Sequence, residues 1–106
     1  DGYIEKLFNM IGSDVSNIHE AGIIHGDLTT ANILVSDDEP VFIDFGLGKY
    51  SDLYEDRGTD LLVFKKSLTT IVPEKSEKLF NYFLDGYDDD NIIKKIEEIE
   101  QRGRYL

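Results

Sequence analysis

Two short apolar segments joined by a polar turn constrain the fold of this chain more than any other feature. Residues 33–35 read Ile-Leu-Val and residues 41–43 read Val-Phe-Ile, and the polar residues 36–40 between them end in a proline. This pattern predicts a β-hairpin. Because the two strands of a hairpin are antiparallel, Asn32 before the first strand and Asp44 after the second are expected at the same end of the pair.

The residues around the predicted hairpin have the types and the spacing of a kinase catalytic loop. His25, Gly26 and Asp27 precede Asn32, and Asp44 begins an Asp-Phe-Gly triplet. In such a loop Asp27 orients or deprotonates the accepting hydroxyl, while Asn32 and Asp44 supply oxygen ligands to Mg²⁺. Each triplet alone is common in proteins. Their combination across a hairpin predicts phosphoryl transfer from ATP, which depends on positioning and on neutralising phosphate charge.

Size and composition limit what the chain can be. Its 106 residues, 41% of them hydrophobic, suffice for one modest core but fall well short of a two-lobed kinase. The absence of cysteine excludes disulfides and thiolate metal sites, and no apolar run reaches the roughly 20 residues that span a bilayer. The net charge of -11 argues against a broad basic surface for nucleic acid. We therefore expect a cytoplasmic protein without membrane contact.

The spacing of apolar residues predicts helices on both sides of the hairpin. Residues 3–20 carry an apolar stripe at helical spacing and are followed by Gly22, a suitable C-terminal cap. His19, near the end of this helix, is interpreted as a helix-terminal cation or a surface group. After the hairpin, an N-cap at Thr59 or Asp60 is expected to begin a second helix that reaches residue 71.

Two further helices are predicted towards the C-terminus. Pro73 and Glu74 suit the first turn of one helix, which Gly86 is expected to close. Residues 92–99 place isoleucines on one face and charged residues on the other, as in an amphipathic helix. The expected fold class is therefore mainly α with a small β-hairpin. The chain is expected to form one unit, divided into a helix at 1–22, the loop, hairpin and metal-binding triplet at 23–46, a helical part at 59–102 and a tail at 103–106.

Several motifs together resemble one family, the small atypical kinases of the KEOPS complex, also called the PRPK-type or Bud-family kinases. The resemblance covers nearly the whole chain, as a C-terminal lobe whose N-terminal lobe is absent. The segments that carry it are Ile24-His25-Gly26-Asp27-Leu28-Thr29-Thr30-Ala31-Asn32, Ile43-Asp44-Phe45-Gly46-Leu47, Thr59-Asp60-Leu61-Leu62-Val63-Phe64 and Arg102-Gly103-Arg104.

The resemblance implies an ATP-dependent atypical serine/threonine kinase or ATPase that supports threonylcarbamoyladenosine formation on tRNA. Its expected partners are KEOPS subunits, chiefly the larger tRNA-modifying subunit, which is fused to the kinase in some archaea. By position, Asp27 would be the catalytic base and Asn32 and Asp44 the Mg²⁺ ligands. Asp60 would be a buried carboxylate that braces the catalytic loop, with further support from His25.

The resemblance also suggests a role for the C-terminal tail. Arg102 and Arg104 could contact tRNA or the active site of the partner, although a frayed terminus is an equally good interpretation.

Departures from ordinary protein kinases narrow this interpretation. Gly26 stands where many kinases carry an arginine that pairs with a phosphorylated activation loop, so loop phosphorylation is not expected to control this chain. The residues 46–49, Gly-Leu-Gly-Lys, follow the metal-binding aspartate and are not expected to cradle nucleotide phosphates. A glycine-rich loop and a paired lysine and glutamate are also missing, so this segment alone is expected to bind ATP weakly and to transfer no phosphate.

Two alternatives to a KEOPS-type kinase remain open from the sequence. A small-molecule phosphotransferase of the aminoglycoside or choline kinase type also uses a His-Gly-Asp loop with an asparagine five residues after the aspartate. The third possibility is a lobe without catalytic activity that holds a partner subunit.

Overall fold

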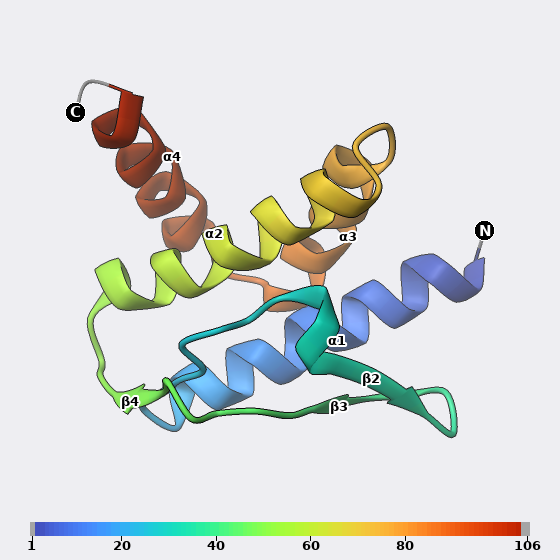
Figure 1. The fold of residues 1–106 in the computed structure, drawn as a ribbon. Coiled ribbons are helices and arrows are strands. Elements are labelled where there is room, and N and C mark those ends of the chain that lie inside the picture. The colour runs from blue at the N-terminus through green and yellow to red at the C-terminus, as the bar shows by residue number, and fades with distance from the viewer. Residues whose placement is uncertain (1, 105–106) are drawn as a thin grey trace.

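The computed structural model describes residues 2–104, apart from the side chain of Arg104. The elements are, in order, α1 (Gly2–Glu20), β1 (Ile23–Ile24), the 3-10 helix η1 (Thr30–Asn32), β2 (Ile33–Ser36), β3 (Glu39–Phe42), β4 (Lys49–Tyr50), α2 (Tyr54–Ile71), α3 (Ser76–Tyr87) and α4 (Asp90–Arg104). Helix α1 packs against α3, and α2 packs against α4 (Figure 1). A mainly α fold with a small β-hairpin is thus confirmed.

The hairpin forms where the sequence predicts it, but its turn is tighter. Strands β2 and β3 are antiparallel, with Ile33 opposite Phe42 and Ser36 opposite Glu39. The turn is therefore only Asp37 and Asp38, both of which have a positive φ (52° and 63°), as a type I′ turn requires. The turn predicted over residues 36–40 was too long because Ser36, Glu39 and Pro40 lie in the strands.

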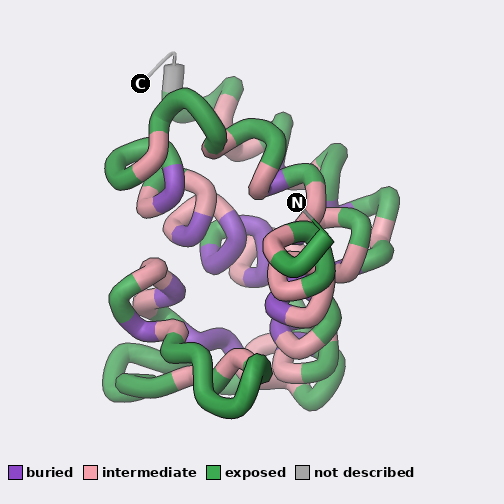
Figure 2. The backbone as a smooth tube through the Cα atoms, turned by 90° about the vertical axis from the view of Figure 1, so that its right-hand side faces the viewer, coloured by how far each residue is buried: buried purple, intermediate pink, exposed green. Residues whose placement is uncertain are grey.

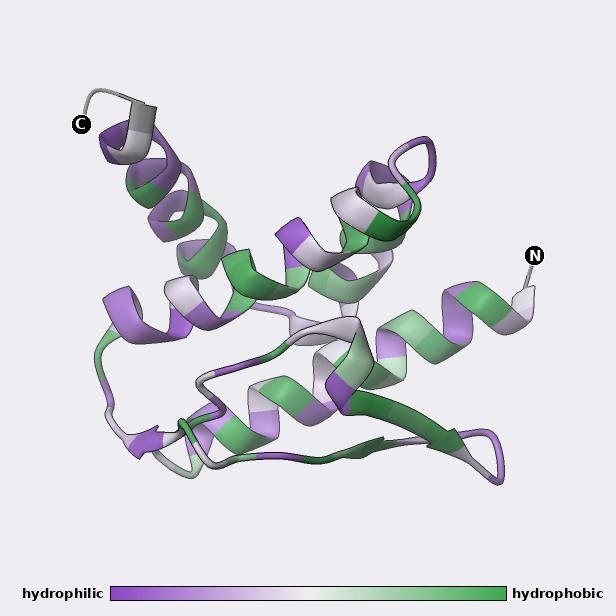
Figure 3. Ribbon diagram, in the orientation of Figure 1, coloured by the Kyte–Doolittle hydropathy of each residue, from purple (hydrophilic) through white to green (hydrophobic). Residues whose placement is uncertain are grey.

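The strands of the hairpin leave apolar side chains in solvent. Leu34 and Val35 on β2 are 49% and 50% exposed, and Val41 on β3 is also exposed. Figure 3 shows apolar strands that end in a polar tip. Residues 2–104 therefore leave these apolar side chains of the hairpin uncovered.

A second antiparallel pair, which the sequence did not predict, joins the segment before the loop to the segment after the Asp-Phe-Gly triplet. Ile23 of β1 pairs with Tyr50 of β4, and Ile24 pairs with Lys49. Two-residue strands carry too little apolar alternation to be recognised in a sequence. This pair returns the chain to the start of the predicted catalytic loop before α2 begins.

The core lies where the helices meet, and the buried positions face inward (Figure 2). Three phenylalanine rings form its centre: the ring centroid of Phe64 on α2 lies 4.7 Å from that of Phe83 and 6.5 Å from that of Phe80, both on α3. Ile11 and Val15 of α1 are buried in the same cluster. None of the helices in residues 2–104 is both long and apolar enough to cross a membrane.

Two glycines allow α1 and α3 to approach closely. A Cβ atom on Gly12 would lie 2.0 Å from the carbonyl oxygen of Phe83, and one on Gly86 would lie 2.0 Å from the carbonyl oxygen of Asn9. Gly86 therefore does not close α3, as the sequence suggested. The helix continues to Tyr87 and ends at Asp88, which takes the left-handed conformation of a C-cap (φ 56°).

Helix α2 begins five residues before the predicted start. Thr59 and Asp60 are interior residues of the helix, so the prediction that either is the N-cap is wrong. The hydroxyl of Thr59 donates to the carbonyl of Glu55 inside the helix. The first two turns of α2 are mostly polar, so they carry no apolar stripe from which a helix could be predicted, and they contain Gly58. In the structure this glycine lets α4 approach, since a Cβ there would lie 2.8 Å from the Ile99 side chain.

The start of α3 also differs from the prediction. Pro73 and Glu74 lie in a turn, and the helix begins at Ser76. The Ser76 hydroxyl donates to the carbonyl of Pro73, so these residues form the connection from α2 and not the first turn of α3.

Replacing Gly12 by alanine is expected to destabilise the protein. The added methyl group cannot fit between α1 and α3 unless the helices move apart, and overpacking of this kind costs about 1–3 kcal/mol or more. The free energy of unfolding, measured by urea titration, should fall by at least that amount. Gly103→Ala is the matched control, because a Cβ on this helical glycine meets nothing within 4 Å. Equal stability of the two variants would contradict the close packing.

Candidate active site

The carboxylate of Asp60 on α2 holds the start of the predicted catalytic loop, residues 25–32. Its Oδ2 accepts a hydrogen bond from the backbone N–H of His25 (2.9 Å), and its Oδ1 accepts one from the N–H of Gly26 (3.0 Å). The side chain is buried. Because a buried carboxylate requires donors, this pairing fixes both the carboxylate and the entry of the loop.

A third donor to Asp60 comes from α1. The Nε2 atom of His19 lies 2.8 Å from Asp60 Oδ2, and its Nδ1 lies 2.7 Å from the hydroxyl of Tyr87. His19 is completely buried. Burial raises the pKa of Tyr87 well above its ordinary value, so its hydroxyl keeps its proton and can donate to Nδ1. With that tautomer, Nε2–H donates to Asp60.

The interpretation of His19 as a surface group was therefore wrong, because its side chain is completely buried. A signal for its burial was present, since Ile11, Val15 and His19 recur every four residues on the buried stripe of α1. A histidine on such a stripe needs polar partners, and these lie 41 and 68 residues away, at Asp60 and Tyr87. The sequence around His19 does not indicate which residues these partners are.

His25 joins the loop to the Asp-Phe-Gly triplet. Its Nε2–H donates to the carbonyl of Ile43 (2.8 Å), and its Nδ1 accepts from the N–H of Asp27 (3.1 Å). The ring packs against that of Phe45, with 4.3 Å between the centroids. The buried imidazole thus contacts the residue on each side of Asp44.

Asn32 is tied directly to Asp27. The amide Nδ2 of Asn32 donates to the carbonyl oxygen of Asp27 (2.8 Å) and to its carboxylate Oδ2 (3.1 Å). The backbone of Asn32 continues into the hairpin, where its carbonyl accepts from the N–H of Ile43 (2.9 Å). Asn32 and Asp44 therefore leave the hairpin at the same end, as the antiparallel pairing predicts.

Asp44 is exposed and has a left-handed backbone, with φ of 61°. The left-handed conformation costs a residue with a side chain roughly 1–2 kcal/mol. Such strain persists where the surroundings enforce it and is concentrated at functional sites. Here the hairpin before Asp44 and the contact between Phe45 and His25 fix the backbone on both sides.

The oxygen atoms at this position suit Mg²⁺ bound together with phosphates. Both hydrogen bonds of the Asn32 side chain use Nδ2, and within residues 2–104 none uses Oδ1. The Asp44 carboxylate adds a hard anionic donor of the kind that Mg²⁺ prefers. In the same part of the chain, no three His, Cys, Asp or Glu side chains converge as a metal site made by protein alone. The donor set fits an ion that completes its shell with phosphate and water.

A close contact with another segment explains why residue 26 is a glycine, and this contact was not predicted from the sequence. The φ of Gly26 is 91°, and a Cβ would lie 2.3 Å from the carbonyl oxygen of Leu47. Residues 45–48 form a turn that packs on the loop, and the N–H of Gly48 donates to the carbonyl of Phe45 in this turn. Any side chain at position 26 would displace this turn.

The predicted tail contacts are only partly covered by the described residues. Arg102 donates to both carboxylate oxygens of Glu55 near the start of α2 (2.6 and 2.8 Å). The side chain of Arg104 and residues 105–106 lie outside the described residues. Their predicted contact with tRNA or a partner stays a prediction.

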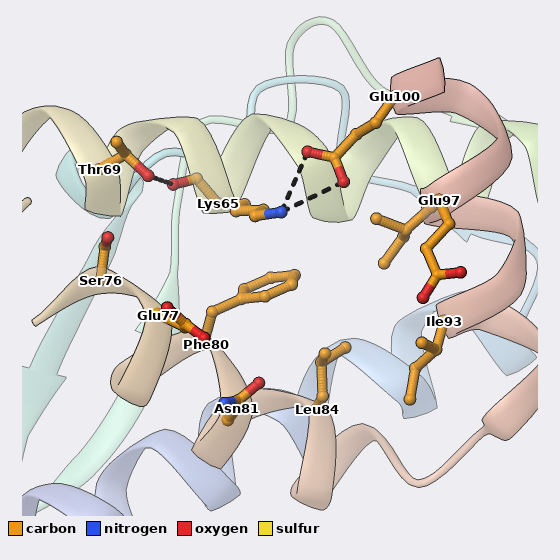
Figure 4. A pocket seen from close by; sticks show the side chains of 11 residues that line it. Lys65, Thr69, Ser76, Glu77, Phe80, Asn81, Leu84, Ile93, Glu97 and Glu100 are labelled. Carbon is orange, nitrogen blue, oxygen red and sulfur yellow. Dashed lines mark hydrogen bonds and ion pairs between the residues drawn. The ribbon is translucent and has the colours of Figure 1, made fainter. Parts of the chain in front are cut away.

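A separate cavity of about 330 Å³ lies between α2, α3 and α4. Lys65 donates to both carboxylate oxygens of Glu100 (3.0 and 3.2 Å) and lies 5.7 Å from the centroid of the Phe80 ring (Figure 4). Leu84 and Ile93 also line the cavity. No residue of the predicted catalytic loop lines it, so it is not part of the candidate active site.

Comparison with known proteins shows the family. The sequence model described as the phosphotransferase enzyme family matches residues 7–92. A protein of Methanosphaera stadtmanae, named as a probable bifunctional tRNA threonylcarbamoyladenosine biosynthesis protein, is 72% identical over 106 residues, which are all of this chain and 20% of that protein. A protein of the same name from Methanothermobacter thermautotrophicus is 50% identical over 103 residues, 94% of this chain and 19% of that protein.

A eukaryotic relative matches almost the same region. The EKC/KEOPS complex subunit BUD32 of Yarrowia lipolytica is 35% identical over 113 residues, which cover 98% of this chain and 46% of that protein. The chain thus spans about a fifth of the bifunctional relatives and just under half of the fungal subunit. It belongs to the phosphotransferase enzyme family, as a kinase-like C-terminal lobe related to BUD32 and to the bifunctional tRNA threonylcarbamoyladenosine biosynthesis proteins.

Proposed function

We propose that this chain is the metal-binding and base-bearing half of an ATP-dependent kinase or ATPase that supports threonylcarbamoyladenosine formation on tRNA. The observation that carries the proposal is the convergence of the Asp27, Asn32 and Asp44 segments, through the hydrogen bonds of Asn32 to Asp27 and of Ile43 to Asn32. The names of the relatives supply the tRNA-modifying context.

In this proposal the residues have separate tasks. The Asp27 carboxylate, fixed by the Asn32 amide, orients the attacking hydroxyl or water and accepts its proton. Asn32 Oδ1 and the Asp44 carboxylate would hold Mg²⁺, which would supply positive charge against the ATP phosphates. Asp60 and His25 hold the loop in the geometry that these tasks require.

The rest of the site is proposed to come from outside this chain. The adenine site and the phosphate-binding loop are assigned to an N-terminal lobe. The exposed apolar pair Leu34 and Val41, which lie opposite each other on one face of the hairpin, is a suitable docking surface for that lobe. Other KEOPS subunits, chiefly the tRNA-modifying one, are the proposed partners. The net charge of -11 favours tRNA contact through those partners or the tail over contact through the body of the lobe.

A small-molecule phosphotransferase is the second candidate, because the matching family description covers phosphotransferases in general. The tRNA-related names of the relatives favour the first candidate. Turnover of an aminoglycoside or of choline by the complete protein would favour the second.

Replacing Asp44 by asparagine in the complete protein should lower kcat for Mg²⁺-dependent ATP hydrolysis by at least about 100-fold, because the anionic metal donor is lost. Asparagine tolerates a left-handed backbone, so the fold should survive. Asp37→Asn is the control, since Asp37 also has a positive φ (52°) but lies at the hairpin tip. ATP hydrolysis at the wild-type rate in the Asp44 variant would remove Asp44 from the site. Unchanged tRNA modification despite lost hydrolysis would favour a docking role.

Replacing Asp60 by asparagine should lower both stability and activity. Both carboxylate oxygens accept hydrogen bonds, from the N–H groups of His25 and Gly26 and from His19, whereas an asparagine amide has only one oxygen. Its NH₂ group would therefore face one of these donors and leave it unsatisfied, and a buried unsatisfied polar group costs about 1–3 kcal/mol. The free energy of unfolding should fall by that amount, and kcat should fall in the fraction that remains folded. Asp85→Asn on the surface of α3 should change neither quantity. A fully stable, fully active Asp60 variant would refute the bracing role.

A further inference from the structure

Helix α2 contacts the predicted catalytic loop at two points that lie seven residues apart. Asp60 holds the N–H groups at the entry of the loop, and Ser67 contacts Thr30 near its exit. Residues seven apart lie on the same face of a helix, about 10 Å apart along its axis. Asp27 therefore lies in the part of the loop between the two contacted residues, Gly26 and Thr30.

The contact at Ser67 satisfies a backbone donor that would otherwise have no partner. Thr30 begins the 3-10 helix η1, and the first N–H groups of a helix find no acceptor inside it. The preceding residue, Thr29, makes no capping hydrogen bond with its side chain. Instead, the Thr30 N–H donates to Ser67 Oγ (2.9 Å), and the hydroxyls of the two residues share a second hydrogen bond (2.9 Å). Ser67 thus caps η1 from another helix.

The capped turn connects the two residues assigned to chemistry. The N–H of Thr29 donates to the carbonyl of Asp27 (2.8 Å), and the N–H of Asn32 donates to the carbonyl of Thr29 (3.0 Å). The Asn32 side chain closes the ring by donating to Asp27. Thr30 is therefore the point at which this ring of hydrogen bonds is attached to the helical scaffold.

We propose that Ser67 is a positioning residue for phosphoryl transfer. By capping η1 at Thr30, Ser67 fixes the positions of Asp27 and Asn32 relative to each other. The inference rests on the proposed function of the loop, but the contact itself does not. Neighbouring hydroxyls on α2 differ, because Thr69 and Thr70 donate to carbonyls of their own helix, four residues back. Of these three side chains, Ser67 alone reaches the loop.

Ser67→Ala in the complete protein tests the proposal through kinetics. Loss of the cap should lower kcat for ATP hydrolysis about 10-fold and raise the Mg²⁺ concentration for half-maximal activity, since displacement of a catalytic group by about 1 Å is costly. The KM for ATP should change less than about twofold, because the adenine site lies elsewhere. Thr70→Ala, which removes a hydroxyl from the same helix, should leave all three quantities unchanged. Ser67→Thr, which keeps the hydroxyl, should restore at least about half of kcat.

Hydrogen exchange separates this inference from the proposed function. Exchange of the Thr30 amide, followed by mass spectrometry with residue-level fragmentation, should accelerate at least about 10-fold in Ser67→Ala and stay unchanged in Thr70→Ala. Unchanged exchange at Thr30 would overturn the cap, whether or not the protein hydrolyses ATP. Faster exchange with unchanged kcat and Mg²⁺ dependence would overturn the positioning role. If the alanine variant melts at a much lower temperature, Ser67→Cys replaces it, because a thiol is only a weak hydrogen-bond acceptor, and the same two changes are expected relative to Ser67→Thr.

Discussion

The structure depends on one buried carboxylate. Asp60 accepts hydrogen bonds from the backbone at His25 and Gly26 and from the imidazole of His19, so it joins α1, α2 and the predicted catalytic loop at a single point. Each bond alone is ordinary. Together they satisfy donors from segments more than 30 residues away from Asp60 in the sequence, and removal of the acceptor would leave several of them buried without a partner. The hydrophobic core holds the helices together, but this group sets where the loop lies on them.

The sequence predicted the elements that have a strong local signal. Helix α1 agrees with its apolar spacing to within one residue, and the hairpin places Asn32 and Asp44 at one end because the antiparallel pairing leaves no alternative. The fold class follows from the same patterns. The relation to the KEOPS-type kinases could also be found in the sequence, because it rests on motifs with fixed spacing.

Three of the errors, at His19, at Gly86 and at the start of α2, have a different physical origin: they concern residues whose roles are set by a distant partner. Gly86 was predicted to end a helix, and Gly58 lies before the predicted start of one, but each lies inside a helix that another helix approaches closely. His19 reads as a surface group until Asp60 and Tyr87 are placed beside it. The spacing along α1 could have indicated that His19 is buried, but its partners and the start of α2 could be recognised only in three dimensions.

The left-handed backbone at Asp44 determines which natural or engineered variants this position can accept. Glutamate would retain the negative charge, but its longer side chain is poorly tolerated at a φ of 61°. Asparagine and glycine fit the backbone but remove the charge. Chemical similarity and conformational compatibility therefore select different substitutions, and aspartate is the residue that combines a short side chain with a carboxylate. A library of variants at this position would accordingly contain many proteins that fold but lack the carboxylate, and few that retain it at another length.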